Sequence, residues 1–378
     1  MKMIRSFLPV GQGAFCCEQI QSASFSNETI NIVYDCGSST DVELVKKQIK
    51  ATFMEDEPIH AVFISHLHDD HINGLEFLLE YCCVKNIIFP LTTNIEKAIL
   101  VLNNLINGVN QDSFAVSFIK DPSLALENKA KYNKQLPHLI QISPEDYIAN
   151  DNGQNTLSTV NSGENLSCYI CDDERIFNHW MYIPFNFRYK DRTQQLTEKL
   201  QQVLRINDDE ILSVENLWIK GTPEIKNKIR AVYKSLPGSL NTNSMTLYSG
   251  TSRCSGFQCF LHSYPCFRVC CDCCCKNVGC LYTGDYEAGK TTNFIELKER
   301  YIKYWDNIGC IQIPHHGSKK DYNKNFSSLD AYFIIFAGQN NKYNHPHPYV
   351  IRDLMFNKHY PLVVTEENKS AIHFVVDY

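Results

Sequence analysis

The segment ISHLHDDHING, residues 64–74, gathers metal-binding side chains directly after the short apolar run AVF. His66, His68, Asp70 and His71 stand within six consecutive positions. Residues two apart in a strand point the same way, so His66 and His68 at a strand end can converge on one point. Asp70 and His71 follow the turn and can face a second point close by. Imidazole and carboxylate suit zinc or another first-row divalent metal, so this segment predicts a metal centre.

Two metal ions about 3.5–4 Å apart form a known hydrolytic device. A water shared by two divalent cations loses its proton near neutral pH, which gives a hydroxide nucleophile without any serine or cysteine. We therefore expect a hydrolase in which Asp70 orients or deprotonates this water.

Alternating strands and helices surround the segment. Four segments have the composition of strands: KMIRSFLPV, ETINIVYDCG, HAVFIS and VKNIIFP. Two segments have helical spacing of apolar residues: DVELVKKQIKATFMED, with Asp41 as N-cap, and NGLEFLLEYCC. This alternation predicts an α/β layered core. We expect residues 1–91 to form its first half, 92–236 an insertion or subdomain of looser pattern, and 237–378 its second half. The last part includes a cysteine-rich excursion at 252–280.

Several motifs carry a resemblance to a known family. HLHDDH resembles the HxHxDH signature of the metallo-β-lactamase fold superfamily, and LYTGDYEAG and IPHHGSKK resemble its later motifs in the same order. FLPVGQGAF, NIVYDCGSS and NKYNHPHP resemble the branch that includes the lactamase-like domain of bacterial DNA-uptake channels and phosphorylcholine esterases. The resemblance implies a four-layer αββα sandwich with the metal site at one edge of its two sheets.

The resemblance also implies a ligand set for two divalent ions, zinc first and manganese as the alternative. His66 and His68 would hold one ion, and Asp70, His71 and one of the pair His315–His316, preferably His316, the other. Asp285 would bridge the ions, and Asp35 would orient ligands through hydrogen bonds.

One departure concerns the first ion. Many members supply a third histidine upstream of the bridging aspartate, where this chain has Asn243 and Ser244. The first site is then short of one ligand. His138, His179 and His262 are alternatives, but each is expected to be a surface or packed histidine.

Phosphodiester hydrolysis is the reaction that the branch favours. Short donors in HHGSKK and NKYNHPHP suit phosphate oxygens, although a solvated loop is the alternative. We assign His345 to catalysis beside Asp70, and we assign substrate binding to a set of five residues: Asn243, Ser244, Ser318, Lys319 and Asn344. The substrate would be a nucleotide, a single-stranded nucleic acid or another small phosphodiester, which makes the chain a phosphodiesterase or nuclease. Thioester, lactone or lactam hydrolysis at the same site is the alternative.

The net charge of −6 and pI near 6.1 argue against a broad basic face for duplex DNA. The N-terminus lacks a continuous apolar run, and no later window resembles a membrane span, so we expect a cytoplasmic protein without a membrane partner.

Seventeen cysteines are unusual for that compartment. Most should be free thiols buried as small apolar side chains. In residues 254–280, the C-x-x-C pair Cys271 and Cys274 leaves a structural zinc as the alternative. A hypothesis of another class follows, in which the chain is an interaction or thiol-sensing module with a degenerate hydrolase core. The intact HxHxDH motif and Asp285 argue against it.

Overall fold

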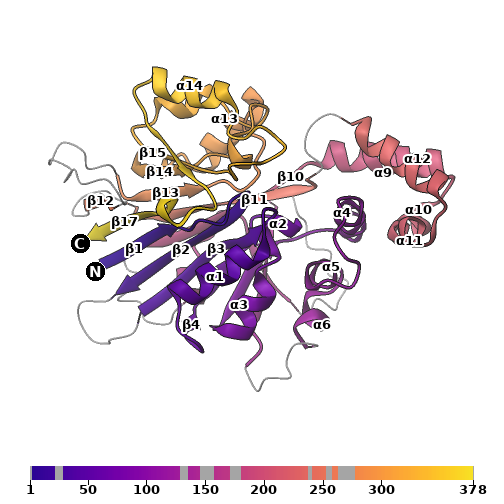
Figure 1. Ribbon diagram of the computed structural model, residues 1–378, viewed down its shortest axis with the longest axis horizontal. Coiled ribbons are helices and arrows are strands. Elements are labelled where there is room, and N and C mark those ends of the chain that lie inside the picture. Colours follow the sequence, from indigo (N-terminus) through magenta and orange to yellow (C-terminus); the bar gives the residue numbers. More distant parts are fainter. Residues whose placement is uncertain are drawn as a thin grey trace.

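Two β-sheets packed face to face form the centre of the protein, and helices cover both outer faces (Figure 1). The computed structural model describes residues 2–21, 29–127, 135–144, 157–170, 180–236, 241–252, 258–262 and 277–377. Helices α1 and α3 cover one sheet, and α13 and α14 cover the other (Figure 1). This is the expected four-layer αββα sandwich, so the predicted fold class is confirmed.

The large sheet has nine strands in the order β12-β17-β1-β2-β3-β5-β7-β8-β9. Its strands from β12 to β3 pair antiparallel, and those from β3 to β9 pair parallel. Their bounds are β1 Lys2–Phe7, β2 Gly13–Gln21, β3 Thr29–Ser38, β5 Ala61–Phe63, β7 Asn86–Pro90, β8 His138–Ser143, β9 Ser158–Asn161, β12 Gln258–His262 and β17 Ile372–Asp377.

The small sheet has six strands in the order β10-β11-β13-β14-β15-β16. The first three pair antiparallel, and the strands from β13 to β16 pair parallel. Their bounds are β10 Met181–Arg188, β11 Asn243–Gly250, β13 Gly279–Tyr282, β14 Ile308–Gln312, β15 Tyr332–Phe336 and β16 Pro361–Val364. A separate parallel pair consists of β4 Pro58–Ile59 and β6 Cys83–Val84.

The helices begin where the sequence supplies caps. Asp41 accepts a hydrogen bond from the Glu43 backbone and caps α1, whose Val45 and Ile49 are buried one turn apart. The α-helices are α1 Val42–Thr52, α2 Asp69–Ile72, α3 Leu75–Tyr81, α4 Asn94–Ile106, α5 Phe114–Lys120, α6 Pro122–Glu127, α7 Ser167–Ile170, α9 Lys190–Leu204, α10 Asp208–Ile211, α11 Val214–Lys220, α12 Pro223–Lys234, α13 Thr291–Arg300 and α14 Pro348–Phe356. Short 3-10 turns are η3 Trp305–Asn307, η4 His315–Gly317, η5 Lys324–Ser328 and η6 Asn368–Ser370. No helix in the described ranges is long and apolar enough to cross a membrane.

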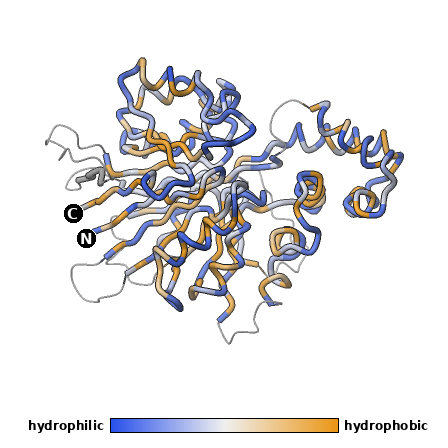
Figure 2. The backbone as a smooth tube through the Cα atoms, in the orientation of Figure 1, coloured by the Kyte–Doolittle hydropathy of each residue, from blue (hydrophilic) through white to orange (hydrophobic). Residues whose placement is uncertain are grey.

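Aromatic side chains fill the space between the sheets. The ring centroids of Tyr34 and Tyr282 are 4.7 Å apart, and those of Phe63 and Tyr182 are 5.7 Å apart. Figure 2 shows apolar residues along the central strands and alternating polar and apolar residues along α9 and α12. Each sheet thus has one apolar face toward the other sheet and one toward its helices.

Residues 92–236 contribute to both sheets. Strands β8 and β9 extend the large sheet, and β10 forms an edge of the small one. Helices α4, α9, α11 and α12 surround a separate apolar cluster that includes Ile99, Leu196, Val214 and Ile229. Part of the segment expected as an insertion is therefore built into the sandwich, while its boundaries stay a prediction.

A buried ion pair lies between the sheets. Arg5 Nε is 2.7 Å from Glu18 Oε1, and both side chains are almost completely buried. Tyr182 and Ser249 donate hydrogen bonds to Glu18 Oε2, and Tyr282 donates to Oε1. The carboxylate of Glu18 thereby joins β1 and β2 of the large sheet to β10, β11 and β13 of the small sheet.

The described cysteines are free thiols, and most of them are buried, as expected. Burial raises the pKa of the Cys17 thiol to about 12. Of the cysteine-rich segment, Cys280 lies buried in β13. The other cysteine side chains, including those of Cys271 and Cys274, lie outside the described residues, so the structural zinc stays a prediction.

Candidate metal centre

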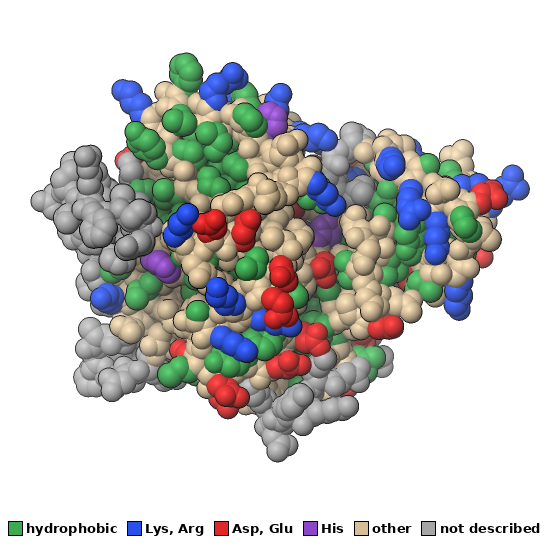
Figure 3. Space-filling model, in the orientation of Figure 1, with side chains coloured by type: hydrophobic (Ala, Val, Ile, Leu, Met, Phe, Trp, Pro, Cys, Tyr) green, Lys and Arg blue, Asp and Glu red, His purple; other side chains and the backbone are tan. Residues whose placement is uncertain are grey.

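The candidate ligands lie where parallel strands of both sheets end. His66 follows β5 of the large sheet, whereas Asp285 follows β13 and His315 and His316 follow β14 of the small sheet. Parallel strands place their carboxyl ends at one edge of a sheet, and the two edges meet here. Figure 3 shows a hollow in the surface between the two-sheet body and the helices at the right, with histidine and acidic side chains in it.

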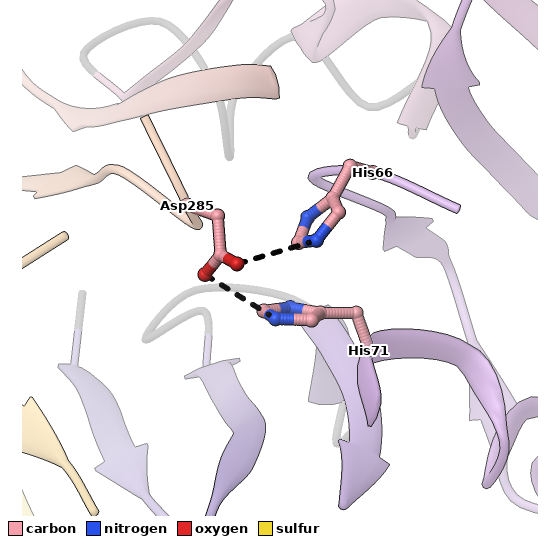
Figure 4. Close-up of side chains that lie close together, drawn as sticks. All are labelled: His66, His71 and Asp285. Atoms are coloured by element: carbon pink, nitrogen blue, oxygen red, sulfur yellow. Dashed lines mark ion pairs between the residues drawn. The ribbon is translucent and has the colours of Figure 1, made fainter. Parts of the chain in front are cut away.

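Asp285 stands between two histidines from the HLHDDH segment (Figure 4). Its Oδ2 lies 3.6 Å from His66 Nε2, and its Oδ1 lies 3.5 Å from His71 Nε2. Two ligand atoms of a tetrahedral zinc are about 3.3 Å apart when the bonds are about 2.0–2.1 Å long. The carboxylate is therefore spaced to share one metal with each histidine.

Two further groups overlap with this one. His66, His68 and Asp70 have ligand atoms within 4.8 Å of one another, and so do Asp70, His71 and His316. His316 Nε2 lies 3.7 Å from Asp70 Oδ2. The structure thus brings six predicted ligands together in overlapping groups, namely His66, His68, Asp70, His71, Asp285 and His316, while their division between two metals stays a prediction.

Buried ligand atoms without hydrogen-bond partners show that the residues fit a metal. His66 Nε2, His71 Nε2, His316 Nε2 and Asp285 Oδ1 are all buried and unpaired. An unpaired buried polar atom costs roughly 1–3 kcal/mol. Divalent cations bound here would satisfy these four atoms, which no hydrogen bond within the described residues does.

Asp35 holds the opposite side of two of these histidines. This completely buried residue lies 2.8 Å from His71 Nδ1 and accepts hydrogen bonds from the Ser65 backbone and hydroxyl, both at 2.7 Å. The same hydroxyl lies 3.0 Å from His66 Nδ1. The Nε2 atoms are left facing the centre, which is the position expected of a carboxylate that orients metal ligands.

The electrostatics of the metal-free chain favour cation binding. Burial holds the pKa of His66 well below its ordinary value and also lowers that of His68. Although burial opposes it, the neighbouring imidazoles of His315 and His66 hold the pKa of Asp285 well below its usual range. Neutral imidazole and ionised carboxylate are the forms that bind metals.

The predicted catalytic pair lies at the solvent side of this centre. The Asp70 side chain is 26% exposed. The His345 ring centroid is 5.8 Å from that of His315 and 6.3 Å from that of His316. Burial and these two imidazoles lower the pKa of His345 to about 4.

Two of the predicted substrate-binding residues are not at the surface. Asn243 and Ser244 are completely buried in β11, where Asn243 donates to Asn186 and Ser244 donates to the Thr283 carbonyl. Neither side chain reaches the surface, so their assignment to substrate is corrected. Lys319 and Asn344 are exposed, whereas Ser318 is largely buried and its hydroxyl accepts from the Lys320 backbone.

The alternative histidines do not complete the centre within the described residues. His138 begins β8, at the opposite end of the parallel strands from His66, and is exposed. His179 and the side chain of His262 lie outside the described residues.

The sequence analysis missed several residues that touch the ligands. Asn103 Nδ2 lies 3.0 Å from His68 Nε2, and Asn104 contacts the backbone of the same loop. Asp321 Oδ2 lies 2.7 Å from His315 Nδ1. Asp321 is close to the HHG motif in the chain, and a carboxylate shortly after paired histidines was a usable signal; Asn103 offered none.

The family model of the metallo-beta-lactamase superfamily matches residues 20–97, which include HLHDDH and Asp35. This segment of the chain thus resembles the metallo-beta-lactamase superfamily, whose members are metal-dependent hydrolases, and the clusters of histidine and aspartate described above are suited to divalent metal.

Comparisons with known proteins add two solved structures. One is the metallo-beta-lactamase SMB-1 bound to 2-mercaptoethanesulfonate, with 11% identity, a TM-score of 0.30, and coverage of 82% of this chain and 79% of that chain. The other is SMB-1 in complex with mercaptoacetic acid, with 11% identity, a TM-score of 0.28, and coverage of 79% and 72%. These scores are low, so the family rests on the match over residues 20–97. No curated protein matches the chain.

Proposed function

We propose that this protein is a phosphodiesterase that acts on a nucleotide, a single-stranded nucleic acid or another small phosphodiester. The observation that carries the proposal is the set of cationic and hydrogen-bonding side chains at the solvent side of the centre. His345 lies next to the histidines of the HHG motif, and Lys319 is exposed on the loop that follows this motif. A charged phosphodiester requires such donors, whereas an ester or lactam carbonyl does not.

The chain's own residues would bind and orient the substrate. His345 and Lys319 would contact phosphate oxygens, and Asp70, which is exposed at its tip, would orient the attacking water. Two divalent ions, which we propose to be zinc with manganese as the alternative, would acidify water and stabilise the charge of the transition state when bound. His66, His68, His71, His316, Asp70 and Asp285 would hold them.

Acyl hydrolysis is the second candidate, and one observation favours it. An open hollow of about 700 Å³ is lined by Pro346, Pro348, Ile351, Arg352, Met355 and Phe356. It begins next to His345 in the chain and is mainly apolar. An acyl chain of a thioester or lactone would fit such a surface better than a phosphate would.

The test compares both substrate classes on protein loaded with zinc or manganese. Bis(p-nitrophenyl) phosphate reports phosphodiester cleavage, and a thioester and a lactone report acyl cleavage. We expect phosphodiester turnover that His68→Ala abolishes and that His138→Ala, a histidine at the other end of the sheet, leaves unchanged. Turnover of acyl substrates alone would refute the proposal in favour of the second candidate. Absence of all turnover with both ions bound would favour the non-catalytic alternative.

A further inference from the structure

Two consecutive histidines of the HHG motif point to different carboxylates of the centre. His316 Nε2 lies 3.7 Å from Asp70 Oδ2, whereas His315 Nε2 lies 3.6 Å from Asp285 Oδ2. The two rings are inclined at 73° to each other. The motif therefore delivers one imidazole to each side of the centre.

The oxygen that His315 approaches is also the one that His66 approaches. Both Nε2 atoms lie 3.6 Å from Asp285 Oδ2, and His71 is the histidine next to the other oxygen, Oδ1. The two carboxylate oxygens therefore separate the imidazoles into two sets. His315 belongs to the set of the first metal, which lacks the third histidine that many superfamily members have.

The other nitrogen of His315 faces a carboxylate, as that of His71 does. Its Nδ1 lies 2.7 Å from the largely buried Asp321, just as His71 Nδ1 lies 2.8 Å from Asp35. His316 Nδ1 is likewise placed 3.1 Å from the Phe336 carbonyl. A carboxylate or carbonyl behind one ring nitrogen directs the second toward a metal.

Backbone geometry supports this arrangement at a cost in strain. His315 and His316 have φ values of 48° and 57°, in the left-handed region, followed by Gly317 at 77°. Non-glycine residues in this region cost roughly 1–2 kcal/mol each. The His315 amide donates to the Gly284 carbonyl at 3.0 Å, which ties this strained turn to the loop that carries Asp285.

We infer that His315 is the third imidazole ligand of the first metal, beside His66, His68 and the shared carboxylate of Asp285. Asp321 is its positioning residue. This assignment rests on the two-metal centre of the proposed function. His315 would take the place of the histidine that many superfamily members have near the position of Asn243. His315 and His316 of the HHG motif would then bind different metals.

Zinc stoichiometry and affinity test the inference without any activity. The metal-free protein is titrated with zinc against a chromophoric chelator, and bound zinc is counted by elemental analysis. We expect two tight equivalents for the wild-type protein. In His315→Ala one equivalent stays tight and the other weakens at least 100-fold, and in Asp321→Asn the same equivalent weakens about 10–100-fold. His345→Ala is the matched control, because its ring centroid lies 5.8 Å from that of His315 while the ion pairs of Asp285 are with His66, His71 and His315, and it should keep both equivalents.

Two tight equivalents in His315→Ala would overturn the inference, and so would a single tight equivalent in the wild-type protein. His315→Gln and thermal melts of the metal-free variants separate loss of a ligand from loss of the fold. A variant that melts at the same temperature as the wild-type protein but binds one zinc ion more weakly supports the inference. Failure of the proposed function looks different, because it would leave both zinc ions bound and phosphodiesters uncleaved.

Discussion

Asp35 is the residue whose replacement tests the logic of the centre most directly. An ionised carboxylate can only accept hydrogen bonds, so the Ser65 hydroxyl 2.7 Å away must donate to it. That hydroxyl is then free to accept from His66 Nδ1, and His71 Nδ1 donates to the carboxylate itself. One carboxylate thereby fixes the protons of both histidines on Nδ1 and leaves both Nε2 lone pairs for metal.

Asp35→Asn changes which nitrogen of His71 carries the proton, while the side chain keeps almost the same shape. Asp35 has a φ of 54°, and asparagine tolerates the left-handed region as aspartate does, so the backbone is retained. The new amide group would face His71 Nδ1 with a donor. His71 would then have to accept at Nδ1 and carry its proton on Nε2, where it blocks the metal. Loss of such a second contact typically costs 10–100-fold in metal affinity, which corresponds to about 1.4–2.7 kcal/mol.

The assay is the same zinc competition titration, made on metal-free protein at one pH. Asp69→Asn is the matched control, because the Asp69 carboxylate accepts from Asn73 and lies next to Asp70 without facing the centre. We expect Asp35→Asn to weaken zinc binding by 10–100-fold, as above, and Asp69→Asn to leave it unchanged. Equal zinc affinity in Asp35→Asn and wild type would refute the argument that this carboxylate sets the tautomers.

Three further predictions concern other parts of the chain. Asn103 Nδ2 can only donate to His68 Nε2, where it competes with a metal for the lone pair, so Asn103→Ala should tighten one zinc equivalent by up to about 10-fold in the same titration. Glu18→Gln leaves Arg5 as an uncompensated buried cation and should lower the free energy of unfolding by about 3–5 kcal/mol, measured by urea denaturation. Burial, with a contribution from Lys85, lowers the pKa of His60 to about 4. Because the unfolded chain then binds the proton more strongly, stability should fall by up to about 3 kcal/mol between pH 6.5 and 4, and His60→Gln should remove this part of the pH dependence.

Two of these predictions have a control of the same residue type. Asn107→Ala should leave zinc binding unchanged, because Asn107 donates to Asn103 and does not contact His68. Glu43→Gln breaks an exposed ion pair of the same 2.7 Å length and should cost no more than about 1 kcal/mol. Equal destabilisation by Glu18→Gln and Glu43→Gln would show that burial does not decide the strength of these pairs. A stability profile of His60→Gln identical to that of wild type would contradict the pH argument.

The sequence predicted best what a single strand end determines. His66, His68, Asp70 and His71 are neighbours in the chain, so the short loop from β5 to α2 brings them together. Asn103 lies 35 positions from His68 and reaches it because α4 packs against the loop, which no local pattern records. Asn243 and Ser244 were misassigned for the same reason: their position in the chain suggested the site, but they pair with β10 and are completely buried.

The chemistry of the two ligand sets argues for different metal preferences at the two positions. The first set, with His66, His68 and His315, is rich in imidazole and has a share of one carboxylate, which suits zinc rather than manganese. The second set, with His71, His316, Asp70 and the other oxygen of Asp285, has an equal number of nitrogen and oxygen ligands and accepts manganese more readily. Because Asp285 belongs to both sets, an ion at either position neutralises the carboxylate that the other requires, and its positive charge lies close to the second site. Two carboxylates lie behind these histidines: Asp35 is 2.8 Å from His71 Nδ1 and reaches His66 through Ser65, and Asp321 is 2.7 Å from His315 Nδ1. These two buried carboxylates return negative charge to a centre that would otherwise repel its second cation, which is why we regard them as part of the metal site rather than as supports for single rings.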